Sequence, residues 1–205
     1  MALTKQSPDS FELGPIRPPS EAYSLLIRVT RNCPWNRCKF CHTYKGEKFQ
    51  LRPVAEIKQD IIATKAIQDR IKEISWKSGY GGRAQEVARM ILNNPPNQAY
   101  YNVALWLYAG GESAFLQDAN SLIMRTNELA EVIRFLRETF PDIKRITSYA
   151  RSKTAARKKV DELIELGEAG LSRLHIGLES GYDPLLQYMD KGVTAAEHVK
   201  GGRQV

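Results

Sequence analysis

The sequence lacks any long hydrophobic segment. No apolar run approaches the roughly 20 residues that a membrane-spanning helix needs, and residues 1–10 have no apolar stretch like that of a secretory signal. Hydrophobic residues make up 42% and charged residues 26% of the chain, as in ordinary globular proteins. We therefore expect a globular protein without a membrane partner, located in the cytoplasm.

Cysteine is also scarce. The chain has three cysteines in 205 residues, and all of them lie in one short stretch, at Cys33, Cys38 and Cys41. A disulfide framework uses cysteines in pairs, so an odd number excludes a fully paired one. Three unpaired thiols fit a reducing compartment. Their crowding among Asn, Arg and Lys indicates a metal or iron–sulfur site.

Negative charge is in the minority, and the formal net charge is +7. This balance weakly favours acidic partners and leaves nucleic acid open as a partner. The one dense basic patch is better interpreted as a solvated helix face than as a binding surface. It consists of Arg151, Lys153, Arg157, Lys158 and Lys159.

Apolar runs and helical spacing alternate along most of the chain. Short apolar runs predict strands at residues 23–30, 103–109, 143–149 and 174–178. Helical spacing, caps and glycine stops predict helices at residues 54–75, 84–92, 128–140 and 154–168, with further helices starting at 183 and 194. Repeated strand–helix units predict an α/β fold with a parallel sheet, of which about four units are present.

Candidate functional residues follow each predicted strand. The cysteines follow the first strand, and Gly110, Gly111 and Glu112 follow the second. Ser148 to Arg151 follow the third strand, and Glu179 and Ser180 follow the fourth. Ligands of parallel α/β sheets bind at the carboxyl ends of the strands, so one shared site is expected there.

The cysteine loop resembles that of the radical S-adenosylmethionine (radical SAM) superfamily. Those enzymes carry a Cys-x3-Cys-x2-Cys loop after the first strand of a partial (β/α)6 barrel, with an aromatic residue before the last cysteine. Here Cys38-Lys39-Phe40-Cys41 matches the second half, while the first gap, at residues 34–37, holds four residues. The resemblance implies a partial parallel (β/α) barrel.

The resemblance also implies cofactors and roles. Cys33, Cys38 and Cys41 would hold a [4Fe-4S] cluster with one iron open to S-adenosylmethionine. Reductive cleavage would then yield a 5′-deoxyadenosyl radical that abstracts hydrogen from an unknown substrate, with flavodoxin or ferredoxin as electron donor. Further implied contacts with S-adenosylmethionine are Phe40 near the adenine, Gly110, Gly111 and Glu112 at the amino group, and Ser148, Arg151, Glu179 and Ser180 at the carboxylate or ribose.

Two other functions compete with this one. A non-enzymatic zinc module could use the cysteines with His42 or His175, and an iron–sulfur electron-transfer module would need no S-adenosylmethionine. Structural zinc sites usually show two paired half-sites, and only one cluster of cysteines is present here.

The expected organisation is an irregular arm followed by one domain. Four prolines within residues 1–22 predict the arm, and residues 23–205 would form the radical SAM core. Since that core normally has six strand–helix units, we expect a core shortened at its carboxyl end.

Overall fold

The computed structural model describes residues 9–205. Within these residues, the main sheet has four parallel strands in the order β1 (Leu25–Arg28), β4 (Ser113–Gln117), β5 (Arg145–Ala150) and β6 (Leu171–Ile176). A short antiparallel pair, β2 (Thr30–Arg31) and β3 (Gln50–Leu51), closes the base of the cysteine-containing loop. The predicted parallel α/β fold is confirmed.

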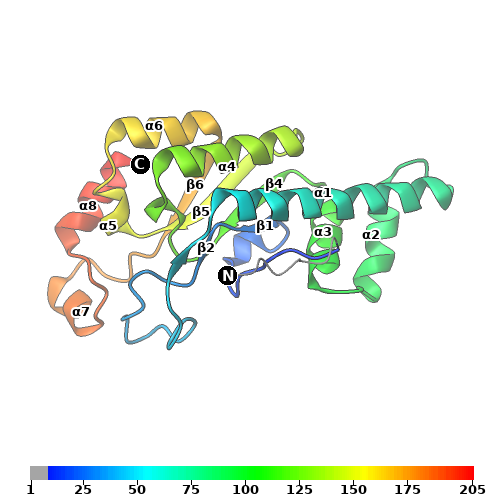
Figure 1. Cartoon of the computed structure of the whole chain (residues 1–205). Coiled ribbons are helices and arrows are strands. Elements are labelled where there is room, and N and C mark those ends of the chain that lie inside the picture. The colour runs from blue at the N-terminus through cyan, green and yellow to red at the C-terminus, as the bar shows by residue number, and fades with distance from the viewer. Residues whose placement is uncertain (1–8) are drawn as a thin grey trace.

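Helices lie along one face of the sheet (Figure 1). These are α1 (Val54–Lys77), α4 (Thr126–Thr139) and α6 (Val160–Ala169). The remaining elements are the helices α2 (Ala84–Asn93), α3 (Gln98–Tyr108), α5 (Ser152–Ala155), α7 (Asp183–Tyr188) and α8 (Ala195–Gln204), and the 3-10 turns η1 (Pro19–Glu21) and η2 (Ser121–Ile123). None of the helices within residues 9–205 has the length and apolar content needed to cross a membrane.

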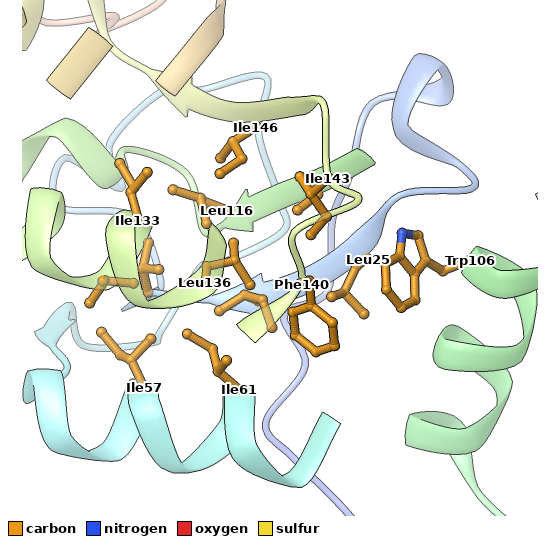
Figure 2. Close-up of a cluster of buried hydrophobic side chains, with 14 of the residues drawn as sticks. Leu25, Ile57, Ile61, Trp106, Leu116, Ile133, Leu136, Phe140, Ile143 and Ile146 are labelled. Carbon is orange, nitrogen blue, oxygen red and sulfur yellow. The ribbon is translucent and has the colours of Figure 1, made fainter. Parts of the chain in front are cut away.

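The core lies between these helices and the sheet. Figure 2 shows Ile57 and Ile61 of α1 facing Leu136 of α4 and, above them, Leu116 of β4. All four side chains are fully buried. Strand residues alternate between two faces, so Leu116 faces the helices while its neighbours Phe115 and Gln117 face the opposite side.

The amino-terminal arm covers part of that opposite face. The Gln117 side chain accepts a hydrogen bond from the Gly14 N–H at 2.9 Å and donates to the Ile16 carbonyl at 2.7 Å. Phe11 is buried in the core. The arm expected at residues 1–22 is thus packed on the sheet from residue 9 onward, and residues 1–8 lie outside the described residues.

Glu21 anchors the arm at the amino end of the sheet. Its carboxylate is fully buried and accepts hydrogen bonds from Ser24, Arg173 and, at 3.2 Å, Arg145. Burial alone would raise the pKa of Glu21, but the bonds from Ser24 and Arg173 and the charge of Arg145 outweigh it and lower the pKa below 4.5.

This lowered pKa predicts a pH-dependent stability difference. A carboxyl whose pKa is lower in the folded state stabilises the fold above its unfolded pKa and loses that contribution as pH falls through its folded pKa. Glu21→Gln should therefore lower the free energy of unfolding by roughly 1–3 kcal/mol near neutral pH. Urea unfolding at several pH values should show this difference shrinking below about pH 4.5. A difference that does not change with pH would contradict the assignment.

The predicted strand at residues 103–109 is wrong, because residues 103–108 belong to helix α3 and Ala109 caps its end. Asn97 begins the helix by accepting a hydrogen bond from the Tyr100 N–H at 2.9 Å. Val103 and Trp106 pack in the core at helical spacing, and Gly110 and Gly111 end the helix with positive φ angles of 100° and 73°. The true second strand is β4, which starts after these glycines.

The hydrogen bond that Asn97 accepts at the start of α3 offers a test of this correction. Asn97→Ala should lower the free energy of unfolding by about 0.5–2 kcal/mol, because it removes the acceptor for the Tyr100 N–H. Asn97→Asp keeps that acceptor and should stay close to the wild type. Urea unfolding of both variants checks the prediction, and equal stability of the alanine variant and the wild type would contradict it.

The other elements agree with the sequence-based predictions apart from their bounds. The helix expected at residues 154–168 is divided into α5 and α6. The fourth strand begins three residues earlier than expected, at Leu171 rather than at 174. The expected capping box of the last helix is present, with Thr194 accepting from the Glu197 N–H at 3.1 Å.

Candidate active site

The cysteine loop follows β1 and β2 at the carboxyl end of the sheet. Cys33, Cys38 and Cys41 are all half-buried and form no disulfide. The Cys41 N–H donates to the Cys38 carbonyl at 3.3 Å, and the Asn36 N–H donates to Cys33 Sγ at 3.4 Å. These bonds hold the three thiols on one folded loop.

The thiols lie within electrostatic range of one another and of two cations. Burial raises the pKa of the Cys38 thiol, the charges of Lys191 and Arg151 lower it, and the neighbouring Cys33 and Cys41 raise it. Among residues 9–205, however, no three His, Cys, Asp or Glu side chains are arranged to bind a single metal ion.

The chemistry of the three thiols bears on which metal group the loop could hold. A zinc site needs its ligands to converge on one ion at about 2.0–2.3 Å. An iron–sulfur cluster is held by cysteine thiolates, and each thiolate of a [4Fe-4S] cluster binds a different iron atom, so the sulfurs stay apart. The donor set of Cys33, Cys38 and Cys41, three free thiols on one loop, suits a [4Fe-4S] cluster.

The connection between α7 and α8 covers the cysteine loop. The Trp35 indole N–H donates to the Asp190 carbonyl at 2.7 Å, and the Lys39 N–H donates to the Met189 carbonyl at 2.9 Å. A Cβ on Gly192 would lie 2.3 Å from the Trp35 ring, so only glycine fits beneath the indole. The loop after β1 is thereby fixed to the segment that follows β6.

Arg151 lies where β5 ends, between this connection and the loop. Its guanidinium donates to the Lys191 carbonyl at 2.6 Å and lies 5.0 Å from the centre of the Trp35 ring. Burial lowers the pKa of Arg151, while the Cys33 and Cys38 thiols raise it. The structure thus brings Arg151 to the cysteines.

Glu179 also reaches this region through Lys191. Glu179 Oε1 and Lys191 Nζ are 2.8 Å apart, and the same ammonium lies 5.4 Å from the centre of the exposed Phe40 ring. The Ser180 hydroxyl accepts a hydrogen bond from the Tyr182 N–H at 3.0 Å and so supports the turn before α7.

Two predicted placements need correction. Gly110, Gly111 and Glu112 precede β4, so they lie at the amino end of the sheet, and the exposed Glu112 carboxylate pairs with Lys144 at 2.6 Å. Ser148 faces the helix side of β5 because strand residues alternate. Its buried hydroxyl donates within the sheet to the Leu116 carbonyl at 3.3 Å. Neither position supports a contact with a cofactor beside the cysteines.

Sequence reasoning missed four residues of this region. These are Trp35, Asp118, Asn120 and Lys191. Asp118 follows β4 directly, and its buried carboxylate accepts a hydrogen bond from the Asn32 N–H at 2.9 Å. Asn120 accepts from the Arg151 N–H at 3.0 Å. Correct placement of the second strand would have pointed to Asp118 and Asn120, since both then follow its carboxyl end.

A solved structure with a similar fold is that of apo OxsB. Apo OxsB, described as a cobalamin-dependent S-adenosylmethionine radical enzyme, aligns with a TM-score of 0.51 and 16% sequence identity. The alignment covers 89% of this chain and 22% of that chain, so the chain spans less than a quarter of OxsB. At this identity the likeness shows a shared fold.

The family comparison covers most of the chain. No curated protein is similar enough to count as a match, but the sequence model of the Radical SAM superfamily matches residues 27–204. Enzymes of this superfamily use a [4Fe-4S] cluster and S-adenosylmethionine and generally need an external electron donor. The match includes the end of β1, the cysteine loop and the other three strands of the parallel sheet, and the chain therefore belongs to the radical SAM superfamily.

Proposed function

We propose that this chain binds a [4Fe-4S] cluster through Cys33, Cys38 and Cys41 and cleaves S-adenosylmethionine reductively. One observation carries the proposal. Three half-buried thiols lie on one loop at the carboxyl end of a parallel sheet, beside Arg151 from the end of β5 and Lys191 from the segment after β6. When bound and reduced, the cluster supplies one electron to the sulfonium, giving methionine and a 5′-deoxyadenosyl radical that takes hydrogen from a substrate.

The basic residues beside the loop have two proposed roles. Burial leaves the pKa of Cys38 raised overall, and the charges of Lys191 and Arg151 oppose that shift, which favours the thiolate form that binds iron. Arg151 would also bind the carboxylate of S-adenosylmethionine, because a guanidinium binds carboxylates in two-point geometry. Its hydrogen bond to the Lys191 carbonyl holds the guanidinium beside the loop.

Two further side chains could position the nucleoside part. The Phe40 ring is 46% exposed, which leaves an aromatic face for the adenine. Glu179 is exposed in the turn after β6 and is held by Lys191; its carboxylate could accept hydrogen bonds from the ribose hydroxyls. The Trp35 indole, held under the 189–192 segment, would limit the access of water to the thiols.

The remaining partners follow from this chemistry. A one-electron donor such as flavodoxin or ferredoxin would reduce the cluster. Three free thiols also fit the reducing cytoplasm as the compartment. The substrate that gives up hydrogen is selected by the residues around the cofactors, not by the fold itself.

Product analysis tests the proposed function. The chain is reconstituted anaerobically with iron and sulfide, reduced with dithionite and mixed with S-adenosylmethionine. Chromatography with mass detection should show 5′-deoxyadenosine accumulating with time, and omission of dithionite should abolish it. A chain with a complete cluster that forms no 5′-deoxyadenosine would contradict the proposal and favour an electron-transfer module.

A further inference from the structure

A single buried carboxylate contacts both ends of the cysteine loop. Asp118 Oδ2 accepts hydrogen bonds from Arg28 Nε at 2.9 Å, Arg28 Nη2 at 2.6 Å and the Asn32 N–H at 2.9 Å. Asp118 Oδ1 accepts from the Tyr44 hydroxyl at 2.8 Å. The carboxylate is fully buried, so these bonds are shielded from water and each is strengthened by its charge.

The donors bracket the three cysteines in the sequence. Asn32 directly precedes Cys33, and Tyr44 follows shortly after Cys41. Asn32 and Tyr44 are therefore both hydrogen-bonded to Asp118, the residue that directly follows β4. Figure 1 shows the loop between β2 and α1 extending away from the sheet toward α7, so its base is the part that the sheet can hold.

The surroundings of Asp118 enclose its carboxylate. A Cβ on Gly14 would lie 2.4 Å from Asp118 Oδ1, so the arm closes over the carboxylate. Tyr44 is buried, and burial together with the Asp118 charge raises the pKa of Tyr44, so its hydroxyl stays a donor. Every bond that Asp118 makes in the described residues thus runs to the loop, to its flanking residues or to the strand before it.

We propose that Asp118 is a positioning residue that sets the spacing of the three thiols by anchoring both ends of the cysteine loop. The inference rests on the proposed function, since the spacing matters for cluster binding. The inference goes beyond the proposed function because it assigns the geometry of the cysteine loop to Asp118, a residue that lies outside the loop and directly follows β4. Loss of the anchor should let the loop open while the sheet and its helices stay folded.

The test uses thiol reactivity in the metal-free chain. Asp118→Ala leaves three donors without their acceptor, and Tyr44→Phe releases one end of the loop alone. We expect alkylation of the cysteines by iodoacetamide, followed by mass spectrometry, to be about 10- to 100-fold faster in Asp118→Ala. Tyr44→Phe should show a smaller increase. Asp118→Asn keeps an acceptor for Arg28 and Asn32 and should partly restore slow alkylation.

A second readout follows cluster binding itself. Iron per chain after reconstitution should fall in Asp118→Ala and less in Tyr44→Phe, with a broadened electron paramagnetic resonance spectrum of the reduced protein. Matched controls are Asp69→Ala, an exposed residue paired with Lys65 on α1, and Tyr108→Phe, an exposed tyrosine that ends α3. Both should behave like the wild type.

The outcomes separate the anchor from general stability and from the proposed function. Unchanged alkylation and iron content in Asp118→Ala and Tyr44→Phe would overturn the proposal, even if their thermal midpoints fall. If Asp118→Ala does not fold, Tyr44→Phe decides by the same two readouts. A wild-type chain that takes up no iron would overturn the proposed function, while the alkylation rates would still decide the role of Asp118.

Discussion

Replacement of Cys38 by serine is expected to abolish stable cluster binding and the formation of 5′-deoxyadenosine. A thiolate is the iron ligand, and a serine hydroxyl does not ionise at neutral pH, so one iron atom would lose its protein ligand. Cys38 lies between the other two cysteines in the loop, and its thiol is within electrostatic range of Lys191 and Arg151. Its loss should therefore affect the whole site.

Iron content and visible absorbance after anaerobic reconstitution measure this effect directly. His42→Ala is the informative control, because His42 is exposed and directly follows Cys41. A zinc module that used His42 would lose its metal in this variant, whereas the cluster site should keep its iron. Full iron content in Cys38→Ser would contradict the assignment of the ligands.

Replacement of Arg52 by methionine is expected to destabilise the fold by about 3–5 kcal/mol, because it leaves a buried charge without a partner. Arg52 is 3% exposed, and its Nη1 atom contacts Asp60 Oδ2 at 2.7 Å and the Arg28 carbonyl at 2.5 Å. Asp60 is fully buried on α1. Burial raises the pKa of Asp60 in spite of the opposing charge of Arg52.

The double variant Arg52→Met with Asp60→Leu should recover most of this stability, since removing both charges of a buried pair is often neutral. Lys65→Met is the matched surface control. Its partner Asp69 is exposed, and exposed pairs contribute about 0–1 kcal/mol. Urea unfolding measures all three variants. An Arg52→Met variant as stable as the wild type, or a double variant no better than the single one, would contradict this prediction.

The sequence was sufficient to predict the parallel sheet and the cysteine loop. Short apolar runs flanked by helical spacing located three of the four strands, and the crowded cysteines identified the site without any knowledge of distant contacts. Arg151 and Glu179 were found because they follow correctly placed strands, and the structure brings both to the loop.

The second strand was misplaced because short apolar runs are ambiguous. Residues 103–109 are almost continuously apolar, and periodicity cannot separate a buried strand from a buried helix over so few residues. Asn97 at the helix start and the two glycines at its end were the better signals. Because of this error, Gly110–Glu112 were expected at the wrong end of the sheet, and Asp118 was not recognised as a candidate site residue.

Other parts of the site depend on contacts between residues far apart in the chain. Asp118 bonds to Arg28, Asn32 and Tyr44, and Trp35 bonds to Asp190 across most of the sequence. A single sequence carries no signal for such pairs. The side chain of Ser148 was expected on the wrong face of the sheet for a different reason. A difference of one residue along a strand moves a side chain to the opposite face.

The most direct test of the account is the electron paramagnetic resonance spectrum of the reduced, reconstituted chain with and without S-adenosylmethionine. Three cysteine ligands leave one iron of a [4Fe-4S] cluster open, so the account predicts a cluster signal whose g values shift when S-adenosylmethionine is added. A cluster signal that is identical with and without S-adenosylmethionine, or a colourless chain that binds only zinc, would contradict it.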